Sequence, residues 1–174
     1  MPRTSAEERI KQTFLFTKPV NPLKPTAAEL NAGLDIQCRT MRNETRLSAV
    51  GSETFSEPLG CEPGNPTDFG SSNFEGSLTI FRWLDSTGKP ETTEDEVWDA
   101  FKVKGTEFWA YQRQGPRHDQ EWAAADADVE YFHGTTDNPQ QPSDTGAGYL
   151  KKVVPLALRG DCKVDGSVTI TAGP

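Results

Sequence analysis

Glycine and proline interrupt this chain too often for long helices to form. The sequence contains 15 Gly and 13 Pro in 174 residues, more than the usual combined share of roughly 12%. The apolar stretches between them have the length of strands. Aromatic residues make up 9% of the chain, and a chain of this size can bury about 70% of its unfolded surface. These features predict a single folded domain that is mainly β.

Short alternating or apolar runs bounded by turn residues mark seven or eight strands. The clearest is Phe74–Trp83, with Leu78 and Ile80 on one face and Phe81 and Trp83 on the other. We therefore expect this strand to be packed from both sides. The other expected strands are Gln12–Phe16, Leu34–Cys38, 43–50, Glu107–Arg113, Asp128–His133, Tyr149–Leu158, and a C-terminal pair, 162–164 and 167–171, joined by an Asp165-Gly166 turn.

One firm helix is expected beside these strands. Residues 93–96, Thr-Glu-Asp-Glu, have the pattern of a capping box. Val97, Trp98 and Phe101 follow at helical spacing, and we expect them to form a core between helix and sheet.

A shorter helix is expected after Pro25, because Thr26 and Glu29 have the spacing of a second capping box. Gly33 is expected to end this helix in the left-handed conformation. The predicted fold class is thus two packed antiparallel sheets, a sandwich or barrel-like arrangement, with one flanking α-helix.

The domain organisation is expected to be simple. No internal repeat occurs, and residues 1–174 are interpreted as one domain. Residues 1–11 are charged and are interpreted as an N-terminal arm. Residues 51–73 are rich in Gly, Pro and Ser, and loops of this length are usually functional or disordered. An interaction loop and a solvent-exposed loop both fit this stretch.

The charge balance argues against tight binding of nucleic acid. The chain has 18 basic and 26 acidic residues, for a net charge of -8, whereas proteins that grip phosphates need an excess of Lys and Arg. The acidic excess lies in residues 51–150, while residues 1–50 are net basic. A basic arm and an acidic body allow attraction between copies, although ordinary solvated faces give the same pattern.

Nothing in the sequence points to an enzyme, a cofactor or a metal. Cys38, Cys61 and Cys162 are odd in number and widely spaced, which is typical of reduced thiols in a cytoplasm. Only His118 and His133 occur, and no nucleophile, zinc or phosphate-binding motif is present. The longest apolar run, Val153–Leu158, is too short to span a membrane. The N-terminal residues lack the apolar core of a signal peptide.

Three segments together resemble the major tail (tail tube) proteins of long-tailed phages, siphoviruses, of actinobacteria. Residues 25–36, PTAAELNAGLDI, are similar to the proline-threonine entry, short helix and glycine that precede the family's first long strand. Residues 74–82, FEGSLTIFR, and residues 107–115, EFWAYQRQG, resemble two later strands. None of these motifs is specific alone, but their order and spacing match across most of residues 12–172.

The resemblance implies a virion structural protein. Its family implies two packed sheets with a flanking helix and six copies in a ring. Stacked rings would form the tube for DNA ejection. Implied partners are the protein itself, a tape-measure protein, and tail terminator and baseplate proteins, with assembly in the bacterial host cytoplasm. No sign of the extra immunoglobulin-like C-terminal domain of some relatives is present.

An acidic lumen would keep DNA from adhering, because like charges gain nothing from counterion release. The sequence does not say which strand face points inward, so the candidates stay open. The candidate lumen acids are Asp95, Asp99, Asp126, Asp128 and Glu130, and the candidate contacts between rings are Arg3, Arg9, Lys11 and the 51–73 loop.

Two alternatives remain at this point. One is a monomeric β-sandwich binding module, for example for carbohydrate, which would need exposed aromatic residues. Trp83, Trp98 and Trp109 fit core positions, whereas Trp122 is expected to be the exposed one. The other alternative is a different tail component, such as a terminator or head–tail connector.

Overall fold

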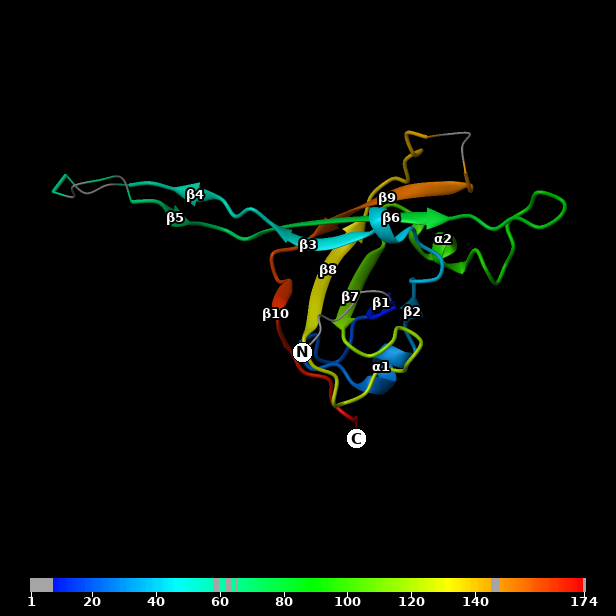
Figure 1. The fold of residues 1–174 in the computed structure, drawn as a ribbon, viewed down its shortest axis with the longest axis horizontal. Helices are drawn as coiled ribbons and strands as arrows, with labels where there is room; N and C mark the ends of the chain where they lie inside the picture. Colours follow the sequence, from blue (N-terminus) through cyan, green and yellow to red (C-terminus); the bar gives the residue numbers. More distant parts are fainter. Residues whose placement is uncertain (1–7, 58–59, 62–63, 65, 145–147, 174) are drawn as a thin grey trace, which may run out of the picture.

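One continuous antiparallel sheet dominates the fold. The computed structural model describes residues 8–57, 60–61, 64, 66–144 and 148–173. The sheet has the strand order β2-β1-β7-β8-β9-β6-β3, with β10 pairing along part of β8 (Figure 1). This confirms the mainly β antiparallel class. The strands are β1 (Ile10–Leu15), β2 (Leu34–Asp35), β3 (Arg46–Val50), β6 (Asn73–Phe81), β7 (Glu107–Gln114), β8 (Val129–Thr136), β9 (Lys151–Leu158) and β10 (Lys163–Val168).

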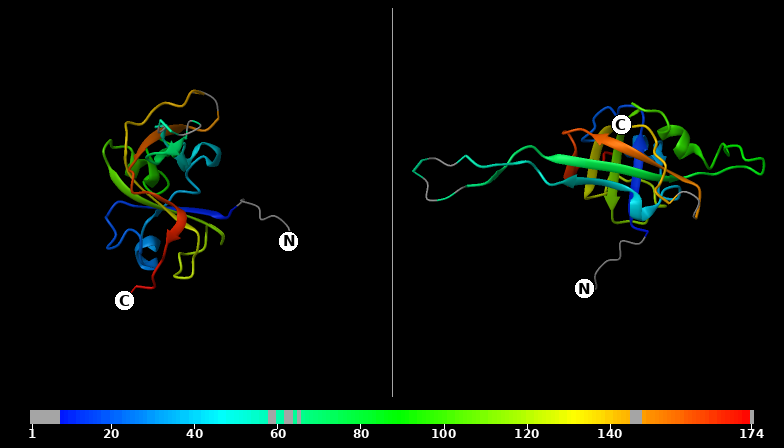
Figure 2. Two further views of the ribbon diagram at one scale, coloured as in Figure 1. Left: turned by 90° about the vertical axis from the view of Figure 1, so that its left-hand side faces the viewer. Right: turned by 90° about the horizontal axis from the view of Figure 1, so that it is seen from above.

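The sheet folds over itself and so produces two packed layers. Strands β1, β7 and β8 form one layer, and β3, β6 and β9 cross it steeply as the other (Figures 1 and 2). We call the apolar residues between the layers the inner core. The helix α2 (Glu96–Phe101) closes one open end of it, with Val97 and Phe101 fully buried and Trp98 packed against the core. The inner core also contains Phe14, Ile36, Leu47, Leu78, Ile80, Phe108, Ala110, Phe132, Val154, Leu156 and Cys162.

A second cluster, the outer core, lies on the opposite face of β1, β7 and β8. The helix α1 (Ala27–Asn31), the segment around Trp122 and the C-terminal segment cover this face. Residues 108–113 are consequently buried on both alternating sides of β7. The outer core contains Leu15, Leu30, Trp109, Tyr111, Trp122, Val129, Tyr131, Val168 and Ile170. The central strands therefore have no solvent-facing side over most of their length.

The first helix begins as the sequence predicts, but its end differs. The Glu29 amide donates to Thr26 Oγ1 at 3.1 Å, and the Thr26 amide donates to Glu29 Oε2 at 2.8 Å, which completes the capping box. Ala32 caps the C-terminus, and Gly33 is not left-handed. A Cβ at Gly33 would lie 2.5 Å from Thr13 Cγ2. This glycine therefore permits close approach to β1, and the predicted left-handed role was wrong.

The predicted capping box of α2 is also wrong. The helix begins at Glu96, and Asp95 at its N-cap makes no side-chain cap bond. Asp95 is instead buried and accepts from the Arg82 guanidinium at 2.8 Å. The Glu91 carboxylate, rather than Asp95, accepts hydrogen bonds from the backbone amides of Thr93 and Glu94 that precede the helix. The described part of the chain has the two expected α-helices, α1 and α2, and a short 3-10 turn, η1 (Arg42–Glu44).

The Asp165-Gly166 pair does not turn the chain. Both residues lie inside β10, where the register with β8 shifts between Lys163 and Ser167. Gly166 has a φ of 69°, which favours glycine. A bulge at Gly and a hairpin turn at Gly share this local requirement. The expected C-terminal hairpin is therefore a bulged single strand.

The described parts of residues 51–73 belong to a hairpin rather than to an irregular loop, while residues 58–59, 62–63 and 65 lie outside the described residues. The chain leaves β3, forms β4 (Thr54–Phe55), returns through β5 (Asp68–Phe69), and enters β6. Figure 1 shows this hairpin reaching far beyond the body of the molecule. The many Gly, Pro and Ser residues of this segment predict no strands. Short strands form here because β4 and β5 pair with each other. We call residues 51–72 the projecting hairpin.

Candidate functional site

The candidate sites of this protein are exposed surfaces rather than a cluster of catalytic side chains in the described part of the chain. Among the residues that the structure describes, no group of three or more His, Cys, Asp and Glu side chains could hold a metal ion. Both ring nitrogens of His133 face carboxylates, Asp161 at 2.9 Å and Glu107 at 3.1 Å. The neighbouring Cys162 thiol is buried, and that burial raises its pKa. A high thiol pKa disfavours the nucleophilic thiolate.

The projecting hairpin is the most exposed element. Phe55 and Phe69 are 51% and 80% exposed. In the register of β4 and β5, Thr54 lies opposite Phe69 and Phe55 lies opposite Asp68. Opposite residues share a face of a ribbon, so each face of the hairpin presents one phenylalanine. The sequence allowed either an interaction loop or a solvent-exposed loop for this segment, and these two residues were missed. The signal that could have found them was an aromatic side chain inside an otherwise polar stretch.

A second apolar surface lies where β6 ends and β9 begins. We call it the aromatic cup; it has a volume of about 450 Å³ and is lined by Phe81, Arg82, Trp83, Leu84 and Tyr149. The Tyr149 ring meets the Phe81 ring edge-on at 6.0 Å. Tyr149 is 83% exposed and Leu84 is 45% exposed. This surface was also missed, because Tyr149 was interpreted as part of a strand.

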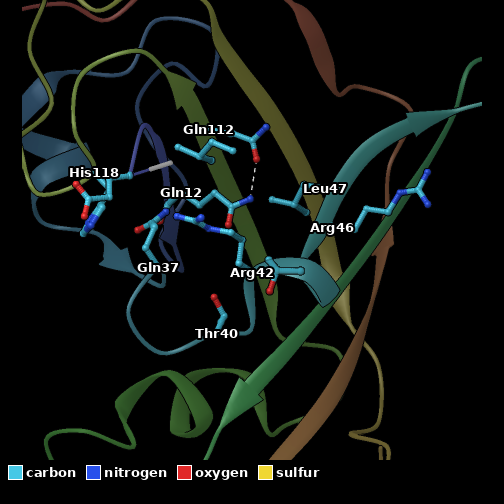
Figure 3. A pocket seen from close by; sticks show the side chains of 11 residues that line it. Gln12, Gln37, Thr40, Arg42, Arg46, Leu47, Gln112 and His118 are labelled. Carbon is cyan, nitrogen blue, oxygen red and sulfur yellow. Dashed lines mark hydrogen bonds between the residues drawn. The ribbon is translucent and has the colours of Figure 1, made fainter. Parts of the chain in front are cut away.

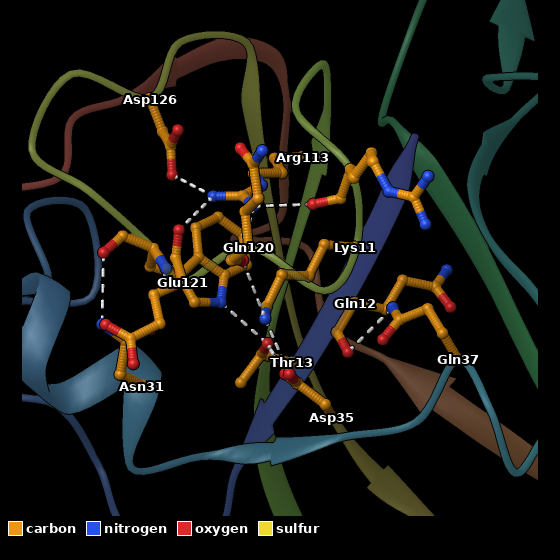
Figure 4. Close-up of polar contacts among 12 residues, drawn as sticks. Lys11, Gln12, Thr13, Asn31, Asp35, Gln37, Arg113, Gln120, Glu121 and Asp126 are labelled. Atoms are coloured by element: carbon orange, nitrogen blue, oxygen red, sulfur yellow. Dashed lines mark hydrogen bonds and ion pairs between the residues drawn. The ribbon is translucent and has the colours of Figure 1, made fainter. Parts of the chain in front are cut away.

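The N-terminal candidates separate into different environments. Arg3 lies outside the described residues. Arg9 is exposed, and its guanidinium donates to the Gly115 carbonyl at 2.9 Å. Lys11 is buried and pairs with Asp35 at 2.7 Å, and it also donates to the Gln120 carbonyl (Figure 4). Lys11 therefore contacts its own chain, and only Arg9 of the described pair has a free surface.

A buried ionic network holds the 116–126 segment on the outer core. The Arg113 guanidinium donates to the Asp126 carboxylate and to the carbonyls of Gln120 and Glu121 (Figure 4). Trp122 is buried in the same region, and its indole N–H donates to Thr13 Oγ1 at 2.8 Å. The expectation that Trp122 is exposed was wrong. Long-range contacts of this kind leave no local signal in the sequence.

The candidate lumen acids are not equivalent. Asp95 and Asp126 are tied to the buried guanidiniums of Arg82 and Arg113. Asp99 is exposed and pairs with Lys102 at 2.7 Å. These three carboxylates therefore already have cationic partners within the chain.

Asp128 and Glu130 lie at the start of β8. Asp128 is exposed and has a positive φ of 53°. Glu130 is half-buried, and its burial raises the pKa of the carboxyl, while the hydrogen bond from Gln112 acts in the opposite direction. Asp128 is the one candidate acid that is both exposed and without an ion-pair partner among the described residues.

A polar pocket of about 290 Å³ lies where the inner core gives way to polar residues (Figure 3). Gln12 donates to Gln112 at 2.6 Å, and Gln37 donates to the Gln12 carbonyl at 3.0 Å. Arg42 and Arg46 stand at its rim. These bonds pair the Gln12, Gln37 and Gln112 side chains at this end of the fold. Thr45 Oγ1, which also lines the pocket, is buried and has no hydrogen-bond partner among the described residues.

The fold is thus a β-rich body with two exposed apolar surfaces, the projecting hairpin and the aromatic cup. A family model described as phage tail tube protein matches residues 1–171. The chain belongs to this family. It is accordingly a phage tail structural protein and a virion component, and it is not an enzyme.

The fold is also found in a tail-related assembly. The chain is similar to one in a solved structure titled "Cryo-EM structure of the anti-feeding prophage (AFP) baseplate, 6-fold symmetrised", with 17% identity and a TM-score of 0.52. The match covers 94% of this chain and 96% of that chain. At this identity the likeness shows the fold alone. No curated protein sequence matches the chain. Within the described residues, no helix is long and apolar enough to cross a membrane.

Proposed function

We propose that copies of this chain close into hexameric rings that stack into the tail tube, the conduit through which DNA leaves the capsid. The observation that carries this proposal is the family match over residues 1–171. The similar baseplate chain comes from an assembly described as 6-fold symmetrised, which supports six copies per ring. The whole chain acts as one tail tube domain in this proposal, and its phage is a siphovirus of actinobacteria.

Two structural features fit an assembling protein. The sheet ends at β3 in a free edge, and free edges invite pairing with another chain unless closure or covering removes them. The projecting hairpin carries exposed phenylalanines that its own chain does not cover. In a closed ring, a neighbouring copy could pair with the β3 edge and cover the exposed phenylalanines. In this proposal residues 51–73 and the 1–11 arm contact neighbouring copies, with Arg9 as the exposed cation of the arm.

The bore of the tube is proposed to be acidic. Of the candidate residues, Asp128 is exposed and lacks an ion-pair partner among the described residues, so it is the first choice for the lumen, followed by Asp99. A negative wall repels phosphate and releases no counterions on contact. The partners proposed beyond the protein itself are a tape-measure protein and terminator and baseplate proteins, met during assembly in the bacterial cytoplasm.

A different tail component is the second candidate, favoured by the baseplate likeness. A carbohydrate-binding module is disfavoured, because the family match over residues 1–171 is to a phage tail tube protein. Trp122, the residue singled out from the sequence for stacking on sugars, is also buried.

The test is negative-stain electron microscopy of the purified protein at rising concentration, beside light scattering of the same sample, with and without a tail initiator complex. Hollow rings or tubes are the expected result. Single closed rings that never stack would favour the terminator or connector. A persistent 19.1 kDa monomer, even with the initiator, would contradict the tube.

A further inference from the structure

We propose that the aromatic cup is a docking site for Phe69 of the projecting hairpin of a second copy of this chain. The inference rests on the proposed function, because it names the contact through which copies of the chain join. It assigns an occupant to a surface that the family match does not assign.

The two surfaces lie at opposite ends of one strand. The projecting hairpin enters β6 at Asn73, and β6 ends in the cup at Phe81. Figure 1 shows the hairpin at one end of the long axis of the molecule and the start of β9 toward the other. A rigid antiparallel strand separates them, so a chain cannot fold its hairpin into its own cup. Only a second copy can bring the two surfaces together.

The cup and the hairpin complement each other in size and polarity. A cavity of about 450 Å³ is within the usual range of ligand pockets, roughly 300–1,000 Å³, and accommodates one aromatic ring and its flanking residues. The Phe81 and Trp83 rings stand edge-on at 6.3 Å, and aromatic pairs favour this geometry. Phe69 is the most exposed phenylalanine of the described residues. Its burial in the cup would remove apolar surface from water on both partners.

Charge favours the same pairing. Residues 51–73 contain four acidic residues, Glu53, Glu57, Glu62 and Asp68, and no Lys or Arg. The segments around the cup, 81–91 and 148–152, contain four basic residues, Arg82, Lys89, Lys151 and Lys152, against two carboxylates, Asp85 and Glu91. Asp144 pairs with Lys151 and Asp95 pairs with Arg82. Lys89, on the turn beside the cup, has no ion-pair partner among the described residues, so it can attract the hairpin. Lys152 is also without such a partner, but it lies opposite Ile80 and so on the other face of the sheet from Phe81.

The hairpin itself needs a partner. Its paired residues, at β4 and β5, are all exposed. Isolated two-stranded ribbons are only marginally stable in water. A cup that holds Phe69 would fix the ribbon in one position. The contact joins different surfaces of two copies, so it is heterologous, and its repetition generates a closed ring or a filament.

The test uses two blocked forms of the full chain. Phe69→Ser removes the hairpin anchor, and the double variant Leu84→Ser with Tyr149→Ser removes the open wall of the cup. Each form alone is expected to raise the concentration at which tubes appear by roughly 30-fold, the effect of losing a hot spot at an interface. Val20→Ser and Val103→Ser replace exposed apolar residues elsewhere, at 94% and 58% exposure, and are the matched controls. Equal thermal unfolding confirms that all variants fold.

Mixing the two blocked forms separates this contact from any other. The first form keeps its cup and the second keeps its hairpin, so a mixture contains one intact contact that cannot extend. Sedimentation is expected to show a 1:1 dimer in the mixture and monomers in each form alone. Dimers of the cup variant alone would mean that hairpins pair with hairpins and would overturn the proposal. Absence of a dimer in the mixture would also overturn it.

The same experiment keeps the two proposals apart. Tubes from both blocked forms at the wild-type concentration overturn the docking site and leave the tube function standing. A dimer in the mixture beside a wild-type protein that never forms rings or tubes supports the docking site and removes the tube function.

Discussion

The central strands and the projecting hairpin are both paired antiparallel strands, but only the central strands are covered by apolar side chains. Phe108 on β7 is fully buried in the inner core, whereas Phe69 on β5 is 80% exposed. Both residues belong to paired antiparallel strands. The difference shows that strand pairing alone does not indicate where the chain is stable, because burial of apolar surface supplies most of the stabilisation. The body covers its own central strands, whereas the paired residues of the hairpin stay exposed in the single chain.

The largest expected effect comes from a cavity in the body. Phe108→Ala should lower the free energy of unfolding by about 4 kcal/mol, because it removes a large buried ring and leaves a void. Phe69→Ala should change it by less than about 0.5 kcal/mol, as an exposed substitution. Guanidinium denaturation followed by tryptophan fluorescence measures both. Similar losses for the two variants would show that the hairpin is folded against the body, contrary to the comparison.

The next effect concerns the ion pair under the 116–126 segment. Asp126→Ala should cost about 3 kcal/mol, because it leaves the buried Arg113 guanidinium without its carboxylate. Asp99→Ala removes a carboxylate from an exposed pair with Lys102 and should cost less than about 1 kcal/mol. Urea denaturation at low and high salt compares the two. If both variants lose equally little stability, the Arg113 network does not hold the segment.

A smaller effect should come from the N-cap of α1. Thr26→Ala removes the acceptor of the Glu29 amide and should cost about 1 kcal/mol. Thr92→Ala, an exposed residue outside the helices, should have almost no effect. Thermal unfolding of the two variants measures the difference. An unchanged midpoint in Thr26→Ala would mean that packing of Leu30 alone maintains the helix.

The smallest effect is a pH dependence at Glu130. Burial raises the pKa of this carboxyl in the folded protein, so the folded state binds its proton more readily than the unfolded state. The corresponding stability is present below the unfolded pKa and is lost as pH rises through the folded pKa. Glu130→Gln should therefore raise the unfolding temperature at neutral pH, and the gain should vanish in acid.

The control for this effect is Glu121→Gln, which changes an exposed carboxyl and should show no such pH dependence. The measurement is calorimetric unfolding between acidic and neutral pH. A gain in Glu130→Gln that is the same at every pH would contradict a role of the buried charge.

The sequence predicted more of the body than of the surfaces. The β1, β6, β7, β8 and β9 strands appear close to their predicted ranges, because alternating or continuous apolar residues report burial directly. The α1 capping box was also correct, since its two hydrogen bonds join residues three positions apart. The resemblance to tail tube proteins was confirmed at the level of the family. The exposed surfaces that we propose for assembly were predicted only as segments.

What the sequence by itself determined is local: which segments form strands, where α1 begins, and that the chain is an acidic, mainly β protein. The tertiary structure decided the rest. It assigned Asp95 to Arg82 instead of the helix cap, buried Trp122 against Thr13, made a bulge of Asp165-Gly166, and extended residues 51–72 as a hairpin. The physical reason is distance along the chain. A cap or an alternating strand depends on neighbouring residues, whereas these outcomes depend on partners that only the folded sheet brings together.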